Sequence, residues 1–72
     1  MNQQKLIEIK NKIEELEFVQ NRLSLISGAS VEARNLRIRG KKVIADIYFI
    51  YSDNTESCPD MEYDLDKLEV GE

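Results

Sequence analysis

Five cationic side chains in one short stretch of the chain have the chemistry to bind phosphate. They lie on both sides of Gly40 in the segment RNLRIRGKKVIADIYFIY, and they are Arg34, Arg37, Arg39, Lys41 and Lys42. Arginine donates bidentate hydrogen bonds to phosphate oxygens, and a two-stranded ribbon can enter a nucleic-acid groove. Tyr48 is placed to stack on a base. A nucleotide or a nucleic acid is therefore one expected partner.

The overall charge argues against that partner. The chain has 72 residues, of which 10 are basic and 14 acidic, and its formal net charge is −4. A negative protein has little generic affinity for nucleic acids or anionic membranes. The same segment is also typical of two adjacent strands whose charges form ordinary cross-strand ion pairs. Phosphate binding is therefore the alternative hypothesis and not the favoured one.

Catalytic groups are scarce in this sequence. The absence of histidine excludes a Ser-His or Cys-His pair within the chain. Cys58, the single cysteine, lies between Glu56 and Asp60, which disfavour a thiolate, so we expect a partly buried, unreactive side chain. The carboxylates in the range 62–66 are expected to form an open row without a cleft. We therefore expect a protein that is not an enzyme, with no catalytic residues and no cofactor.

Metal binding and a membrane location are also not expected. Zinc requires Cys and His ligands, and the chain offers one such residue. The oxygen donors in the range 53–60 lack the glycine and the spacing of an EF-hand loop. One cysteine excludes an intrachain disulfide, which favours a reducing cytoplasm. No segment has the apolar core of a signal peptide or the roughly 18 apolar residues of a membrane span.

The N-terminal part of the chain predicts one long amphipathic helix over residues 1–28. From Asn2 to about Ile26 the residues are good helix formers without Gly or Pro, and Gly28 can supply a left-handed helix end. Apolar residues at spacings of three and four are expected to face the core, and they are Leu6, Ile9, Ile13, Leu16, Val19, Leu23 and Ile26.

A second apolar line lies on the opposite side of this helix. It consists of Ile7, Phe18 and Leu25, which fall together at about 100° per residue. We expect this line to be an oligomer interface, although scattered apolar residues are also common on helix surfaces. Part of the main stripe, from Leu6 to Leu23, also fits a short heptad pattern, so a coiled coil is a further alternative.

After residue 28 the apolar period changes to two, which predicts strands over residues 30–39, 42–51 and 58–65. The parity of the apolar residues changes near Asn35, which predicts a bulge. Gly40 and Lys41 predict a two-residue turn. In the tail, residues 67–72, Leu68 and Val70 are expected to pack on the core. The chain is therefore predicted to be a single α+β domain, 1–72, with the long helix packed on a three-stranded antiparallel meander over 30–66.

The second face of this sheet is expected to change from basic to apolar to acidic across the strands. Its expected partner-binding residues are Ile44, Asp46, Tyr48, Ile50, Asp60, Glu62 and Asp64. We expect a small cytoplasmic binding module that forms a homo-oligomer, with a dimer favoured, and binds another protein as a regulator or inhibitor. Small phage and mobile-element proteins offer an analogy of size only. The alternatives are the phosphate binder and a structural subunit of an assembly.

Overall fold

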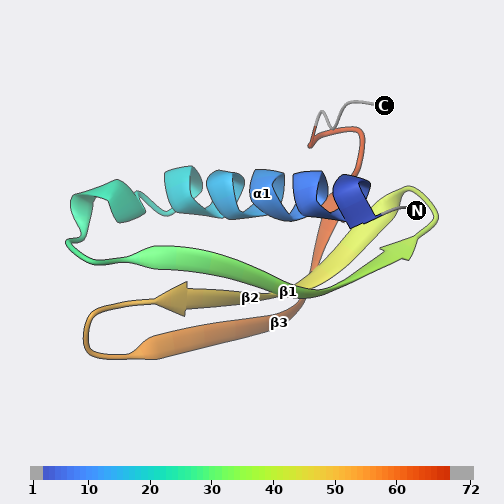
Figure 1. The fold of residues 1–72 in the computed structure, drawn as a ribbon. Coiled ribbons are helices and arrows are strands. Elements are labelled where there is room, and N and C mark those ends of the chain that lie inside the picture. Colours follow the sequence, from blue (N-terminus) through green and yellow to red (C-terminus); the bar gives the residue numbers. More distant parts are fainter. Residues whose placement is uncertain (1–2, 69–72) are drawn as a thin grey trace.

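The computed structural model describes residues 3–68 and has the predicted α+β architecture. Its elements are α1 (Gln3–Gln20), the 3-10 helix η1 (Leu23–Leu25), β1 (Ser30–Arg39), β2 (Lys42–Ile50) and β3 (Thr55–Asp64). The strands form one antiparallel sheet in the order β1-β2-β3. α1 lies across one face of the sheet (Figure 1). The prediction of an N-terminal helix packed on a three-stranded meander is therefore confirmed.

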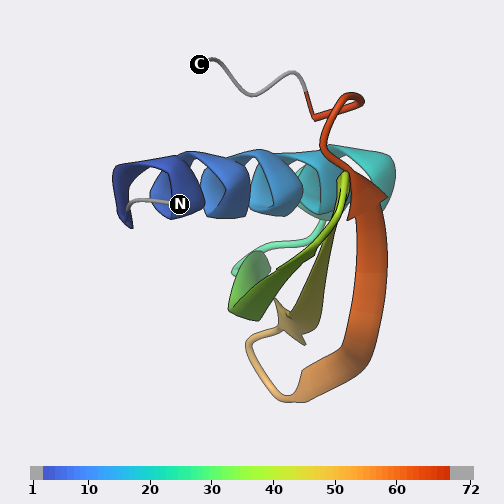
Figure 2. The same cartoon turned by 90° about the vertical axis from the view of Figure 1, so that its right-hand side faces the viewer.

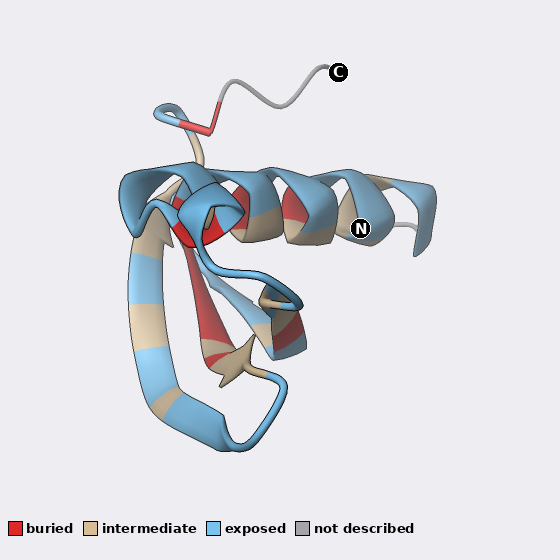
Figure 3. Cartoon of the chain, turned by 90° about the vertical axis from the view of Figure 1, so that its left-hand side faces the viewer, coloured by how far each residue is buried: buried red, intermediate tan, exposed pale blue. Residues whose placement is uncertain are grey.

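The core lies between α1 and the centre of the sheet (Figure 3). Its side chains without solvent exposure are Ile9, Ile13, Ala33, Val43, Ala45 and Ile47. β2 supplies three of these, as expected for a central strand. Leu68 is also buried in this core, as predicted, whereas Val70 lies outside the described residues.

The first hairpin has the predicted turn and the predicted bulge. Arg39 pairs with Lys42, so Gly40 and Lys41 form the two-residue turn, and Gly40 has a φ of 60°. The register of β1 shifts in the range 34–37, where Asn35 has a φ of 55°. Asparagine tolerates this left-handed region better than most residues. The bulge adds one residue to β1 opposite β2.

A second bulge, which the sequence did not predict, lies in β3. Ala45 pairs with Met61 and Ile47 pairs with Cys58, so β3 has one more residue than β2 in this interval. Asp60 has a φ of 57°. β3 bends along its length (Figure 2). The bulge places Cys58 in line with Met61 against the core, and the strand begins three residues before its predicted start.

The helix is shorter than predicted, because α1 ends at Gln20 instead of near residue 28. Arg22 has a left-handed φ of 54°, and the chain then forms η1. The backbone N–H of Asn21 still bonds the main-chain oxygen of Glu17, at 3.0 Å, and its side-chain amide bonds the same oxygen at 2.9 Å, whereas the N–H of Arg22 bonds Val19, three residues back. The break lets Leu23 turn inward, where it is buried. No helix within residues 3–68 combines the length and the apolar character needed to cross a bilayer.

The predicted core-facing stripe is wrong at three of its seven residues. Ile9, Ile13 and Leu23 are buried, but Leu16 and Val19 are exposed, and so is Ile26. The buried position after Ile13 is Glu17, four residues later, which is only 6% exposed. The inward face of α1 therefore contains a carboxylate where the stripe predicted leucine and valine. Because Ile9, Ile13 and Leu23 pack within the chain's own core, they cannot also form a coiled-coil seam.

Two helix carboxylates bind the two edge strands. Glu14 accepts a hydrogen bond at 3.0 Å from the backbone N–H of Ala33 in β1 and also pairs with Lys10. Glu17 accepts a hydrogen bond at 2.6 Å from the hydroxyl of Tyr63 in β3. Burial is the larger cause and the Glu17 carboxylate the smaller cause of a raised pKa of Tyr63, so its hydroxyl stays protonated and donates. These bonds fix the roll of α1 on the sheet.

Removing the Tyr63 hydroxyl should destabilise the fold. In Tyr63→Phe, one oxygen of the buried Glu17 carboxylate loses its donor, and the expected loss is about 1–3 kcal/mol. Urea unfolding at pH 7 measures it as a fall in midpoint of about 1 M or more. Tyr51→Phe is the matched control, because the Tyr51 hydroxyl makes no hydrogen bond within residues 3–68. Equal midpoints for the two variants would contradict the proposed role of Glu17.

Candidate functional site

The face of the sheet away from α1, here called the outer face, has the predicted order of charges across the strands. Arg37 in β1 pairs with Ile44 in β2, which pairs with Glu62 in β3. The next row toward the turn contains Arg39, Lys42 and Asp64 in the same order. Basic residues of one edge strand and acidic residues of the other therefore lie on both sides of β2 on one surface.

Asp46 is the centre of a polar network on the outer face. Its Oδ2 accepts a hydrogen bond from the side-chain amide of Asn35 at 2.9 Å, and its Oδ1 accepts from the backbone N–H of Asp60 at 3.1 Å. Arg37 lies 3.5 Å from Oδ1 and also pairs with the Asp60 carboxylate. Asn35 and Asp60 are the two left-handed bulge residues. One carboxylate on β2 therefore binds the bulges of both edge strands.

The network stabilises the ionised form of Asp46. The pKa of Asp46 is held below its usual range, first by the hydrogen bond from Asn35 and next by that from the Asp60 backbone. The positive charge of Arg37 lowers it further. Asp46 and Asp60 are therefore used within the fold, where they satisfy donors of this chain. Among the predicted partner-binding acids, Glu62 is exposed and Asp64 is half-buried.

Arg34 is also bound within the chain. Its guanidinium donates to Glu32 at 2.6 Å and lies over the ring of Tyr48, 4.8 Å from the ring centroid. The hydrogen bond and the charge of Glu32 raise the pKa of Arg34, so its charge is permanent. Cation–π stacking of this kind covers the face of Tyr48 that a base would use. The predicted base-stacking residue therefore already has an arginine on its ring.

Two cations of the predicted phosphate cluster remain without an ion pair inside residues 3–68, namely Arg39 and Lys41. They lie on both sides of Gly40 at the exposed tip of the first hairpin. Arg34 and Arg37 bind carboxylates, and Lys42 lies 3.6 Å from Glu62. A phosphate at the tip would therefore meet two available cations instead of the five in the sequence.

The outer face is less apolar than predicted. Ile44 is only 8% exposed, although we expected it to be accessible, and Tyr48 and Ile50 are half-buried. Arg37 and Glu62 are the register neighbours of Ile44, and long charged side chains cover apolar neighbours with their methylene stems. None of the exposed large hydrophobic side chains in the described part of the chain lies on this face.

The exposed apolar side chains lie instead along α1 and η1. Within residues 3–68, the large hydrophobic residues that are exposed are Ile7, Leu16, Val19, Leu25, Ile26 and Ile38, and all except Ile38 belong to α1, η1 or the residue after it. Leu25 and Val19 are the most exposed, at 79% and 71%. Ile7 and Leu25 of the predicted oligomer line are exposed, and Phe18 is half-buried.

Several apolar side chains gather around Val19 at the C-terminal end of α1. Val19 borders three shallow hollows, which also involve Leu16, Phe18 and Leu25. The charged residues around these hollows include Lys12, Glu15 and Arg22. We call Leu16, Phe18, Val19 and Leu25 the Val19 surface. Sequence periodicity missed it, because the predicted stripe directed Leu16 and Val19 into the core.

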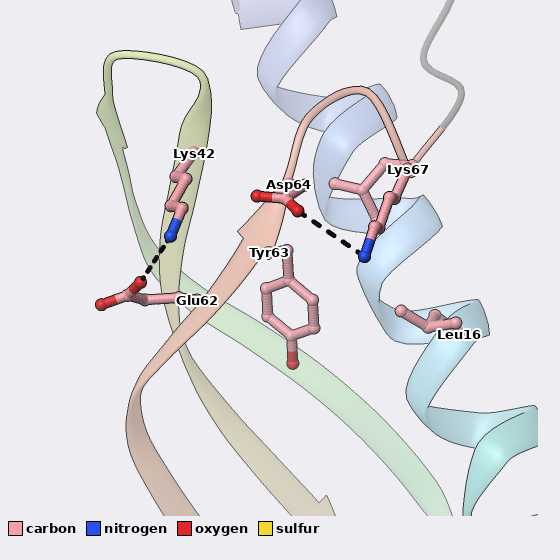
Figure 4. A pocket seen from close by; sticks show the side chains of 7 residues that line it. Leu16, Lys42, Glu62, Tyr63, Asp64 and Lys67 are labelled. Atoms are coloured by element: carbon pink, nitrogen blue, oxygen red, sulfur yellow. Dashed lines mark ion pairs between the residues drawn. The ribbon is translucent and has the colours of Figure 1, made fainter.

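A larger open hollow of about 450 Å³ lies between α1 and the end of β3 (Figure 4). Its lining residues are Leu16, Lys42, Glu62, Tyr63, Asp64, Lys67 and Leu68. Lys67 lies 3.8 Å from Asp64, and Lys42 is paired with Glu62. The charges around this hollow therefore neutralise one another, and the arrangement does not favour a charged ligand.

The described residues contain no cluster of three or more Cys, Asp or Glu side chains arranged to hold a metal ion. Cys58 is half-buried and packs against the core. Comparisons of the chain with protein-family models, with curated proteins and with solved structures gave no match. The functional proposal below is therefore based on the surfaces of this chain alone.

The depressed pKa of Asp46 should make the stability depend on pH. A carboxylate whose pKa is lower in the folded state contributes stability above its unfolded pKa of about 3.9 and loses it as the pH falls through the folded value. Asp46→Asn should therefore unfold at a lower urea midpoint than the native chain at pH 7. The difference should shrink as the pH falls below about 4.

The control for this experiment is Asp53→Asn, in the exposed loop between β2 and β3. The urea midpoint of Asp53→Asn should equal that of the native chain across the whole pH range. The urea midpoint of the native chain minus that of Asp46→Asn is the quantity to follow. If this difference stays constant from pH 7 to pH 2, the charge of the carboxylate is not what stabilises the two bulges.

Proposed function

We propose that this chain is a non-enzymatic protein-binding module, acting as a regulator or inhibitor through the protein that it binds. The observation that supports the proposal is the position of its exposed apolar side chains, which gather on α1 and η1 and leave the outer face of the sheet without any within residues 3–68. A contiguous apolar patch with a charged rim is typical of protein interfaces. The Val19 surface is the proposed contact.

The outer face is assigned a secondary role in this proposal. Its central charges are paired within the chain, so a partner would have to break existing ion pairs to use them. Glu62 and Asp64, near the end of β3, are also paired, with Lys42 at 3.6 Å and Lys67 at 3.8 Å, but these pairs are long and exposed, so a basic partner can replace the lysines at the edge of a contact. Of the predicted partner-binding residues, the proposal therefore keeps Glu62 and Asp64.

Site-specific photo-crosslinking in cells tests the proposal. A photoreactive amino acid in place of Val19 should form covalent adducts with a protein, which mass spectrometry identifies as another protein or as a second copy of this chain. The same amino acid in place of Asp53, which is also exposed but lies in the loop between β2 and β3 and lines none of the hollows around Val19, should form few adducts. Equal yields from the two positions, or no adduct from position 19, would refute the proposal.

A second candidate function is weak phosphate binding at the first hairpin. The supporting observation is the pair of cations at the tip, Arg39 and Lys41, which have no ion pair in the described part of the chain. A contact to two phosphates predicts weak, salt-dependent affinity.

Fluorescence anisotropy with a labelled single-stranded oligonucleotide measures that affinity. We expect binding at 50 mM salt that falls several-fold at 200 mM and is lost in the double variant Arg39→Ala/Lys41→Ala. The control, Lys12→Ala, removes one exposed cation from α1 and should bind as the native chain does. Absence of binding at 50 mM salt would eliminate this candidate.

A further inference from the structure

We infer that the Val19 surface is the interface of a two-fold symmetric homodimer, in which the C-terminal halves of the two α1 helices pack antiparallel. The inference rests on the proposed function, because it assigns an occupant to the surface proposed there. Its arguments are the distribution of charge around Val19, the shape of the neighbouring hollows and the state of the other surfaces of the chain.

Charges of opposite sign lie on the two sides of Val19. Glu15 and Val19 are four residues apart, which places them on one face of α1, and Arg22, just beyond the end of α1, lines a hollow together with Val19. Glu15 lines the hollows that Val19 shares with Leu16 and Phe18, whereas Arg22 lines the hollow on the η1 side. Neither Glu15 nor Arg22 makes an ion pair within residues 3–68. Each is therefore available to a charged group outside the chain.

This order of charges is complementary to itself in one orientation only. A two-fold axis beside Val19 in an antiparallel pair places Glu15 of one copy opposite Arg22 of the other, and symmetry repeats the contact. A parallel pair would place Glu15 beside Glu15 and Arg22 beside Arg22, which is repulsive. The charges thus favour a second copy, and they favour its antiparallel orientation.

The shape of the surface is also suitable for a second copy. Val19 projects with most of its surface exposed, and beside it lies a hollow lined by Phe18, Arg22 and Leu25. In the antiparallel arrangement a projecting side chain of each copy faces the hollow of the other, as in isologous interfaces. The left-handed backbone at Arg22 ends α1 here and sets η1 at an angle to it, which creates the hollow.

Other surfaces of the chain are less suited to self-association. The open edge of β3 contains Pro59 and a bulge, and both features disfavour pairing with another strand. Three apolar residues of the predicted heptad, Ile9, Ile13 and Leu23, are buried inside the chain and cannot contact a second copy. The Val19 surface is the extended apolar surface that remains in the described part of the chain.

Sedimentation equilibrium of the purified full chain tests the inference. The native chain should be a dimer at micromolar to 100 µM concentrations. Val19→Asp should be a monomer with an unchanged circular dichroism spectrum, because the position is exposed and outside the core. A native chain that remains monomeric at 100 µM would overturn the inference, and so would a Val19→Asp variant that remains dimeric.

A charge swap tests the antiparallel orientation. Glu15→Arg and Arg22→Glu should each weaken the dimer about tenfold or more, because both symmetry-related ion pairs become repulsive. The double variant Glu15→Arg/Arg22→Glu restores both pairs with reversed polarity and should recover most of the native affinity. Lys41→Glu, a charge reversal at the tip of the first hairpin, near the N-terminal end of α1 (Figure 1), is the control. Failure of the double variant to recover affinity would overturn the antiparallel pairing.

The two experiments separate the inference from the function on which it rests. If position 19 crosslinks to a different protein in cells while the purified chain is monomeric, the binding module stands and the homodimer is wrong. If the purified chain is monomeric and position 19 yields no adduct, both proposals are wrong. A dimer whose only adduct from position 19 is a second copy supports the homodimer and contradicts the binding of a different protein at this surface.

Discussion

The arrangement of the sheet depends on one carboxylate in the middle of its central strand. Asp46 binds the amide of Asn35 on one side and the backbone N–H of Asp60 on the other, and these are the residues at which the two edge strands bulge. Each bulge inserts one residue and bends its strand. Because a one-residue shift exchanges the two faces of a strand, the bulges also decide which residues of β1 and β3 face α1.

The roll of α1 on this bent sheet determines which apolar residues are left outside. Glu14 binds the backbone of β1 and Glu17 binds Tyr63 of β3, so both edges of the sheet are joined to the helix through carboxylates. With Glu17 inside, Leu16 and Val19 turn toward solvent, and the early end of α1 adds Leu25 beside them. The Val19 surface is thus a consequence of how the core is assembled, which connects the fold directly to the proposed function.

Much of the fold was predictable from local patterns in the sequence. The change of period after residue 28, the turn at Gly40 and the change of parity at Asn35 each depend on neighbouring residues, and all three are confirmed. The bulge at Asp60 was missed, because the clear apolar alternation of β3, at Met61, Tyr63 and Leu65, begins after it, and Cys58 at the predicted start of the strand is a weak sign of the change of parity. The burial of Glu17 depends on Tyr63, 46 residues away. The apolar stripe therefore failed where a long-range hydrogen bond outweighed helical periodicity. The exposure of Ile44 was overestimated for a similar reason, because the side chains that cover it, Arg37 and Glu62, belong to the two neighbouring strands.

The most direct test of the account is a concentration series followed by the methyl NMR signals of the folded chain. The signals of Leu16, Val19 and Leu25 should shift together as the chain is concentrated, while those of the core residues Ile13 and Ile47 stay constant. Shifts confined to the outer face, for example at Ile50, would place the contact on the wrong side of the molecule. Signals that do not change at any concentration, together with the translational diffusion coefficient of a monomer, would contradict the proposed dimer.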